Sequence, residues 1–293
     1  MKIQEILNYT KAFFEIIRVR NCLLGFVGVM LGALLVSQGN FSVLFAQKTV
    51  FAGLAAAFIL GAGNAINDYS DYEIDKINRP NRPLPSKRIS RSDALMMTLT
   101  LFLLGLALSK AINRYCLYIA IFNTVLLVLY AVYSKKVLFL SNLTVSYLVG
   151  SIFIFGALST IDSGVNPLTL PGIQITGILS ICAGLMTISR EIVKDIEDIE
   201  GDKKSYSLTL PIHFGAKTAK KTALVFTIAA VLLSLLPMIF APQGFDTLKY
   251  LIFIGVADIS FLFSFTMHPS LAQQVMVAGM AFSLMGFYAG FLL

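Results

Sequence analysis

The sequence has few of the residues that build zinc sites, disulfides or charged surfaces. There is no tryptophan, and only 13% of the 293 residues are charged, whereas 57% are hydrophobic. We expect the cysteines to be small buried apolar residues, and any aromatic belt at a membrane surface to depend on tyrosine. No pair among the cysteines and histidines has the spacing of a redox motif or a zinc site: Cys22, Cys116, Cys182, His213 and His268.

Long apolar runs occupy most of the chain, and its mean hydropathy is +0.79. Several runs reach the roughly 20 residues that cross the hydrocarbon core of a bilayer. No low-complexity tract or long polar linker interrupts them. The sequence therefore predicts one integral-membrane domain over residues 1–293, an all-α membrane protein with its helices in a single bundle. The nine predicted spans are residues 20–37, 44–66, 93–112, 115–133, 141–161, 173–193, 218–240, 247–266 and 271–292.

A weaker amphipathic segment, residues 1–18, precedes the first span. Its apolar residues, such as Ile6, Leu7 and Phe14, alternate with charged ones such as Lys11 and Glu15. This pattern predicts an N-terminal interfacial helix. The segment lacks the apolar core and cleavage site of a signal peptide, so we expect it to be retained.

The net charge of +7 is unevenly distributed. All but four of the 23 Lys and Arg residues lie at the N-terminus or in the loops on one side of the predicted bundle; the exceptions are Lys48, Lys110, Arg114 and Lys249. This positive-inside pattern places the N-terminus in the cytoplasm and the C-terminus outside the cell membrane. It also argues against nucleic acid as a partner. The sequence indicates membrane lipids as surroundings and no obligatory protein partner.

Two aspartate triads with the same spacing interrupt this apolar background. Carboxylates are costly near a bilayer and usually mark a functional site there. Both triads follow a predicted span and fall on the predicted cytoplasmic side. The 127-residue offset maps the second span onto the sixth, which indicates a weak internal repeat. The triads are Asp68, Asp71 and Asp75, and Asp195, Asp198 and Asp202.

Each triad lies on one face of a helix when it is placed at 100° per residue. Asn64 and Asn67 share the face of the first triad, and Glu191 and Lys194 share that of the second. Two facing carboxylate stripes would repel unless cations lay between them. Oxygen ligands without His or Cys favour Mg²⁺. With the Lys and Arg residues nearby, they suit a diphosphate that bridges two Mg²⁺ ions.

A diphosphate at the rim of an apolar bundle indicates an allylic prenyl diphosphate, whose tail could lie between helices. Departure of the diphosphate would leave an allylic carbocation, which an acceptor captures in a dry pocket. Two other classes remain alternatives. CDP-alcohol phosphotransferases carry a DG…AR element ahead of their final aspartates, which both clusters lack. A cation transporter should carry its acids near the middle of the membrane. Metal-dependent release of diphosphate would exclude both.

Two segments resemble the signatures of a known family. Residues 64–90, NAINDYSDYEIDKINRPNRPLPSKRIS, resemble the first signature of the UbiA superfamily of intramembrane prenyltransferases, NDxxDxxxD followed by RPxRPLPS. Residues 190–215, REIVKDIEDIEGDKKSYSLTLPIHFG, resemble the second, DxxDxxxD followed by a TLP and Gly pattern. Arg18 and Asn21 fit an RxxN feature of the family, and Tyr133-Ser134 with Lys136 fits its YS…K element. The resemblance covers nearly the whole chain.

The resemblance implies Mg²⁺-dependent transfer of a prenyl group from a diphosphate donor to an acceptor. It assigns metal and diphosphate binding, and so the catalytic role, to the six aspartates and Asn67. For Asn64 a helix-packing amide is the alternative, and for the basic residues a topological role. The implied contacts to diphosphate or acceptor are Arg18, Asn21, Asn64, Arg79, Arg82, Tyr133, Lys136, Arg190 and Lys194.

The acceptor follows less directly from the sequence. Residues 17–36, IRVRNCLLGFVGVMLGALLV, are most similar to the archaeal branch of the family, whose donor is geranylgeranyl diphosphate. In that branch the lipid acceptor is geranylgeranylglyceryl phosphate. The alternative is an aromatic acceptor such as 4-hydroxybenzoate. Asp258, in the eighth span, lies outside both motifs, and it is either a functional acid or part of a buried interhelical hydrogen bond.

Overall fold

A computed structural model describes residues 3–133, 137–162, 164–204, 208–240 and 244–291, and every regular element in these ranges is helical. Within these described ranges, nine segments are long and apolar enough to cross a membrane, as the sequence predicts, and α11 and α12 together form one of them. The long helices are α2 (Val19–Val36), α3 (Gln47–Ser70), α5 (Arg91–Ile112), α6 (Arg114–Tyr133), α7 (Leu140–Ser159), α8 (Ile173–Glu197), α11 (Ala216–Leu233), α13 (Thr247–Ser264) and α14 (Pro269–Ala289). The short elements are α1 (Ile3–Ile16), η1 (Phe41–Phe45), α4 (Tyr72–Asn78), η2 (Pro167–Thr169), α9 (Ile199–Lys204), α10 (Leu210–Phe214) and α12 (Pro237–Phe240).

Local sequence signals set several of these helix boundaries. The Ser90 side chain accepts a hydrogen bond from the backbone N–H of Asp93 at 3.0 Å and so caps α5. Asp246 caps α13 in the same way, and Pro269 begins α14, where its missing N–H is not needed. The predicted seventh span is divided by a turn before Pro237, which separates α11 from α12.

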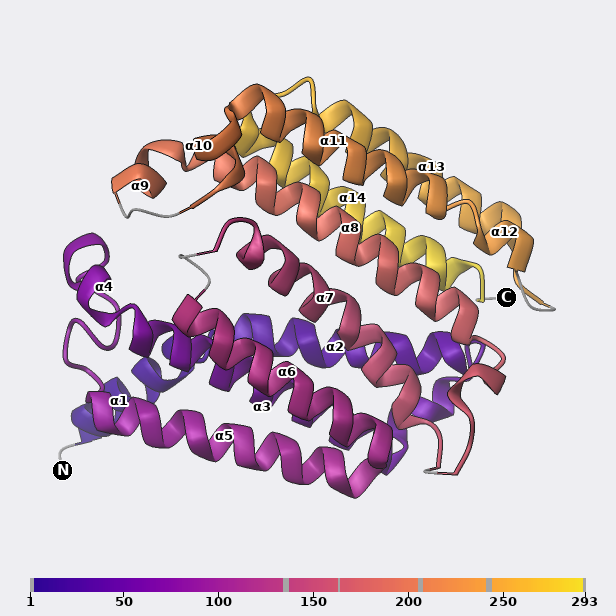
Figure 1. Cartoon of the computed structure of the whole chain (residues 1–293). Coiled ribbons are helices and arrows are strands. Elements are labelled where there is room, and N and C mark those ends of the chain that lie inside the picture. Colours follow the sequence, from indigo (N-terminus) through magenta and orange to yellow (C-terminus); the bar gives the residue numbers. More distant parts are fainter. Residues whose placement is uncertain (1–2, 134–136, 163, 205–207, 241–243, 292–293) are drawn as a thin grey trace.

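The helices form two groups with α7 between them (Figure 1). In the first half, α3 packs against α2, α5 and α6; in the second, α8 packs against α11 and α14, and α13 against α14. α7 contacts both α2 and α8. A buried apolar cluster joins the halves, with Leu35 and Phe153 from the first and Ile175, Tyr250 and Phe287 from the second.

The contact between α2 and α7 depends on glycine. A Cβ atom on Gly32 would overlap the carbonyl oxygen of Phe153, and one on Gly156 would overlap that of Val29. The two backbones therefore approach more closely than side chains allow, as membrane helices with small residues at their interface do. This contact holds α2, which begins directly after Arg18, against α7 at the centre of the bundle.

Large apolar side chains cover the outer surface of the bundle. Leu23 is 61% exposed, Leu103 68% and Ile259 71%. Such a surface is stable only in lipid, and the protein is a multi-pass membrane protein. Asp258, among the half-buried residues of α13, accepts a hydrogen bond from the Ser234 hydroxyl at 2.9 Å, which fits its interpretation as an interhelical contact.

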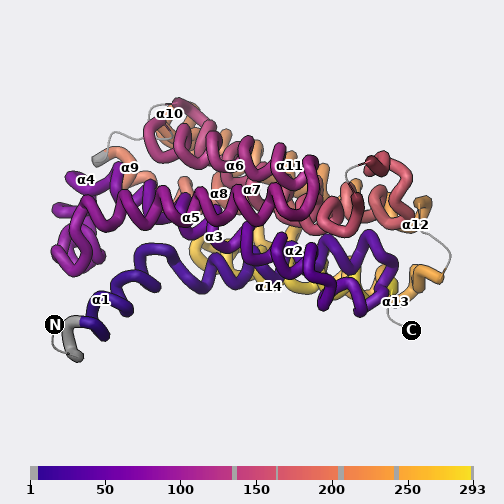
Figure 2. Tube along the Cα trace, turned by 90° about the horizontal axis from the view of Figure 1, so that it is seen from below, coloured from indigo at the N-terminus to yellow at the C-terminus, as the bar shows by residue number. Residues whose placement is uncertain are grey.

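α1 is a helix, as predicted, and it lies at one end of the bundle. Ala12 and Ile16 are fully buried, whereas Ile6, Leu7 and Phe14 are exposed. Figure 2 shows α1, α4 and α9 at the same end as the N-terminus, with α12 and the C-terminus at the other. Both segments that carry the aspartate triads therefore lie at one end of the molecule.

Candidate active site

The middle aspartate of each triad occupies the same backbone position. Asp71 follows the last residue of α3 with φ −84° and ψ 4°, and Asp198 follows α8 with φ −90° and ψ 7°. The backbone N–H of Asp71 donates to Asn67 O, and that of Asp198 donates to Lys194 O, both at 2.9 Å. The third aspartate of each triad lies in the next short helix, α4 or α9. A helix boundary at the middle aspartate was not predicted, yet helical hydrogen bonds continue through it, from Asp75 N–H to Asp71 O and from Asp202 N–H to Asp198 O. Asp68 and Asp75 both reach Arg82, as residues on one helical face do.

Arginines hold the buried aspartates of the first triad. Arg18 Nη2 donates to Asp68 Oδ1 at 2.9 Å. Arg82 Nη1 lies 3.3 Å from the same oxygen and 2.6 Å from Asp75 Oδ2. Asp68 and Asp75 are each 5% exposed. Buried carboxylates require such partners, because each would otherwise be an uncompensated charge in an apolar environment.

The junction between α1 and α2 positions Arg18. Its backbone is left-handed, with φ 53°, so the chain turns there before α2 begins. Asn64 accepts from Arg18 Nη1 at 3.1 Å and donates to Ile17 O at 2.9 Å. Both interpretations of Asn64 therefore apply, since it packs helices and orients the arginine. Asn21 is exposed, and its side chain makes no hydrogen bond to a described residue. Of the predicted RxxN feature, only Arg18 contacts the first triad among the described residues.

The proline-containing loop between α4 and α5 positions Arg82. Leu84 and Ile89 anchor the loop in the core. Arg88 donates to Glu15 of α1 at 2.6 and 3.0 Å, which ties the loop to the N-terminal helix. Arg79 is exposed and has no ion pair with a described carboxylate. Arg79 and Arg82 were both predicted to contact a substrate. The structure places Arg82, but not Arg79, against the aspartates.

The second triad has a different kind of partner. Asn142, a buried residue of α7, donates from Nδ2 to Asp195 Oδ2 at 2.9 Å. The cations nearby bind another acid: Arg190 Nη1 lies 2.8 Å from Glu191 Oε1, and Lys194 Nζ lies 3.5 Å from Glu191 Oε2. Sequence reasoning did not find Asn142, because it lies outside both motifs and 53 positions from its partner.

Tyr130 lies between the two clusters. Its side chain is within electrostatic range of Arg18 and Asp71 from the first half and of Glu191 and Lys194 from the second. Tyr133, the predicted tyrosine, is 49% exposed at the end of α6 and makes no hydrogen bond to a described residue. Tyr130 precedes it by about one helical turn, and that spacing is the signal that could have identified it. Lys136 lies outside the described residues.

The UbiA prenyltransferase family matches residues 25–283. The chain belongs to this family. A digeranylgeranylglyceryl phosphate synthase from Methanosarcina mazei is 37% identical over 294 residues, which covers 96% of this chain and 98% of that one. A solved structure concerned with digeranylgeranylglyceryl phosphate synthase in membranes is 36% identical with a TM-score of 0.81, covering 97% and 98% of the two chains.

A more distant family member shares the fold. The structure of a UbiA homologue from Archaeoglobus fulgidus bound to DMAPP and Mg²⁺ has a TM-score of 0.67 at 18% identity, covering 96% of this chain and 99% of that one. Family membership decides against the CDP-alcohol phosphotransferase and cation-transporter alternatives.

The donor atoms at the site fit Mg²⁺. In the described part of the chain, no three His, Cys, Asp or Glu side chains form a ready metal site. Mg²⁺ does not need one, because it usually takes one or two carboxylates and completes its shell with water and substrate phosphate. Asp198 is exposed and Asp71 is half-buried at the helix boundaries. All-oxygen ligands of this kind match the metal predicted from the sequence.

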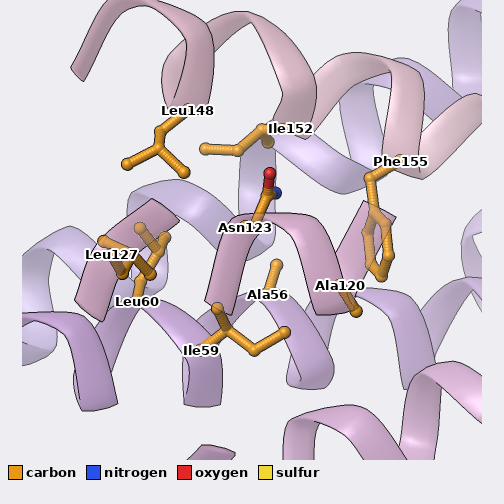
Figure 3. A pocket seen from close by; sticks show the side chains of 9 residues that line it. All are labelled: Ala56, Ile59, Leu60, Ala120, Asn123, Leu127, Leu148, Ile152 and Phe155. Carbon is orange, nitrogen blue, oxygen red and sulfur yellow. The ribbon is translucent and has the colours of Figure 1, made fainter. Parts of the chain in front are cut away.

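Apolar space is available inside the bundle. A cavity of about 30 Å³ lies between α3, α6 and α7, lined by Leu60, Leu127, Ile152 and other apolar residues (Figure 3). Asn123 is its polar residue, and it donates to Ser151 Oγ at 3.1 Å. A larger and more open cleft of about 480 Å³ lies between α2, α13 and α14. The linings of both are apolar, but only the larger cleft has room for part of a hydrocarbon chain.

Proposed function

We propose that this protein transfers a geranylgeranyl group from geranylgeranyl diphosphate to geranylgeranylglyceryl phosphate. The products are diphosphate and digeranylgeranylglyceryl phosphate, an intermediate of archaeal ether lipids. The observation that carries this proposal is the pair of aspartate triads at one end of an apolar bundle, each beside Lys and Arg residues. The relatives of similar length named digeranylgeranylglyceryl phosphate synthase support the choice of acceptor.

The six aspartates and Asn67 would hold Mg²⁺, as two ions bridged by the diphosphate. When bound, the metal neutralises the diphosphate while the C1–O bond breaks. Arg18 and Arg82, which bind Asp68 and Asp75, would supply positive charge beside the diphosphate. Arg79, Tyr133 and Lys136 remain predicted contacts to diphosphate or acceptor.

The apolar bundle would protect the reacting carbon from water. The acceptor hydroxyl oxygen forms a bond to C1 of the donor, its proton leaves, and the bond from C1 to the diphosphate oxygen breaks. Tyr130 lies where its ring and hydroxyl can border this reaction, between the charged groups of the two halves. The prenyl chains would lie along apolar side chains of the bundle, and the cleft between α2, α13 and α14 offers room for part of one.

The chain would function as one membrane domain over residues 1–293, with the N-terminus and both triads in the cytoplasm and the C-terminus outside. The positive-inside distribution of Lys and Arg supports this orientation. The exposed apolar residues of α1, including Leu7 and Phe14, suit a helix lying at the membrane surface. The equivalent helix boundaries at Asp71 and Asp198 support an origin by internal duplication.

A transfer assay in lipid nanodiscs tests the proposal. Radiolabelled geranylgeranyl diphosphate is supplied with Mg²⁺ and, separately, with geranylgeranylglyceryl phosphate or 4-hydroxybenzoate. We expect label in the doubly prenylated glyceryl phosphate, loss of transfer in excess EDTA, and recovery on adding Mg²⁺. Transfer only to the aromatic would replace the acceptor, and transfer that persists in EDTA would contradict the metal-dependent chemistry.

A further inference from the structure

In the described part of the second half, neither Arg190 nor Lys194 makes a hydrogen bond to an aspartate of the triad. Arg190 and Lys194 both bind the carboxylate of Glu191, whose side chain is 16% exposed. In the first half, by contrast, Arg18 and Arg82 bind triad aspartates directly. Within the Arg190–Glu191–Lys194 cluster one carboxylate accompanies two cations, and the next carboxylate within electrostatic range of Lys194 is Asp195, a proposed metal ligand.

The hydrogen-bond donors of this cluster are only partly used. Arg190 donates from Nη1 to Glu191, and its Nε is buried without a partner among the described residues. An unpaired buried donor is costly, so it needs an explanation. The side chains of Arg190 and Lys194 are 31% and 48% exposed, so an anion can reach their remaining N–H groups.

The cluster lies at the candidate active site rather than on a remote face. Lys194 is within electrostatic range of both Asp195 and Tyr130. Tyr130 is also within electrostatic range of Arg18 and Asp71. Lys194 and the first triad therefore both lie near Tyr130.

The proposed reaction brings two phosphate-bearing substrates into one site. Their negative charges repel unless each is neutralised separately. In the proposed function, the metal, Arg18 and Arg82 neutralise the donor diphosphate, whereas Arg190 and Lys194 of α8 bind no triad aspartate in the described part of the chain and are partly exposed. Arginine binds phosphate oxygens through paired N–H groups, and lysine adds a point charge. Arg190 and Lys194 are four residues apart in α8 and so project from neighbouring turns of one face.

We propose that Arg190 and Lys194, held in place by Glu191, bind the phosphate monoester of the lipid acceptor. This inference rests on the proposed function, and it assigns the acceptor headgroup to α8 and the donor diphosphate to the metal and the arginines of the first half. It explains how the enzyme would distinguish a phosphorylated glyceryl lipid from a neutral one.

Binding of the acceptor alone tests this assignment. Nanodiscs without donor or metal are titrated with geranylgeranylglyceryl phosphate and with geranylgeranylglycerol, which lacks the phosphate. We expect Arg190→Gln and Lys194→Gln each to weaken binding of the phosphorylated lipid by about 10- to 100-fold, the loss of a charge-assisted hydrogen bond. Binding of geranylgeranylglycerol should be unchanged. Lys221→Gln removes an exposed positive charge from α11 and is the matched control.

Steady-state kinetics provide the second readout. In both variants the KM for geranylgeranylglyceryl phosphate should rise by a similar factor, while the KM for geranylgeranyl diphosphate stays unchanged. A rise in the donor KM alone, or equal weakening of both lipids, would overturn the assignment. If the wild-type protein binds the phosphorylated lipid but does not prenylate it, the proposed function fails, and the binding titration still decides the role of Arg190 and Lys194.

Discussion

The two halves present the same aspartates to the site but hold them differently. In the first half, Asp68 and Asp75 are buried and bound by Arg18 and Arg82. In the second half, Asp195 is bound by the neutral amide of Asn142, and the nearby cations bind Glu191 instead. The two segments are therefore alike in the spacing of their aspartates and in their helix boundaries, but they differ in the partners of those aspartates. This difference in partners agrees with the proposal that the two halves bind different substrates.

The largest expected effect would show whether the matched aspartates are equivalent. Asp71→Ala and Asp198→Ala should each reduce transfer by about three orders of magnitude or more, because each removes a carboxylate proposed to bind the metal and the diphosphate. The nanodisc transfer assay measures this loss. Near-wild-type activity in either variant would break the equivalence.

Two glutamates that are also 127 positions apart provide matched controls for these variants. Glu73 and Glu200 are exposed acids in equivalent positions of α4 and α9, and neither belongs to a triad. Glu73→Gln and Glu200→Gln should keep transfer within about two-fold of wild type, as expected for exposed charges.

The loss of unfolding free energy on removing a partner should be larger for the first triad, which arginines bind, than for the second, which the Asn142 amide binds. Arg82→Ala leaves two buried carboxylates short of a partner and should cost about 3 kcal/mol. Asn142→Ala removes one hydrogen bond to a carboxylate and should cost about 1.5 kcal/mol. Thermal unfolding in detergent can be followed with a thiol-reactive dye, because Cys22, Cys116 and Cys182 are all free and buried.

Ligand binding and a control variant sharpen that measurement. Mg²⁺ with diphosphate should partly restore the stability of Arg82→Ala, since it supplies positive charge to the same carboxylates. Arg79→Ala, which removes an exposed arginine of the same loop, should change the midpoint little. A larger loss in Asn142→Ala than in Arg82→Ala would reverse the comparison.

A smaller effect is expected for the half-buried acid outside both triads. Asp258→Asn keeps an oxygen that can accept from the Ser234 hydroxyl, so transfer should stay within about two-fold and stability should fall by about 1 kcal/mol or less. The transfer assay and thiol-dye unfolding measure both. Loss of transfer in a folded Asp258→Asn protein would show that the acid has a functional role.

The smallest effect is expected far from the site, at the opposite end of α3. A hydrogen bond from Lys48 lowers the pKa of Asp162 below its usual value of 3.8. The stabilisation from this pair is therefore present above that value and is lost as the pH falls through the lowered pKa. Because Asp162 is exposed, Lys48→Gln should hardly change the unfolding midpoint at pH 7. A large change there would contradict the exposed, screened character of the pair.

Much of the fold could be predicted because its signals are local. Apolar runs long enough to cross a bilayer identified the nine spans. The helix boundary at Asp71 and Asp198 was not predicted. The polar pattern continues through both positions with helical spacing, so nothing in the local sequence separates a continuous helix from a broken one.

By itself, the sequence determined the membrane-spanning helices, the two aspartate triads, the family signatures and the kind of metal that their oxygen ligands suit. Only the tertiary structure decided that Arg18 and Arg82 bind the first triad, that Asn142 binds Asp195, and that Tyr130 rather than Tyr133 lies between the halves. The physical reason is the range of each interaction. Spacing along a helix follows from its 3.6-residue turn, whereas partners 50 and 53 positions apart meet only because particular helices pack together.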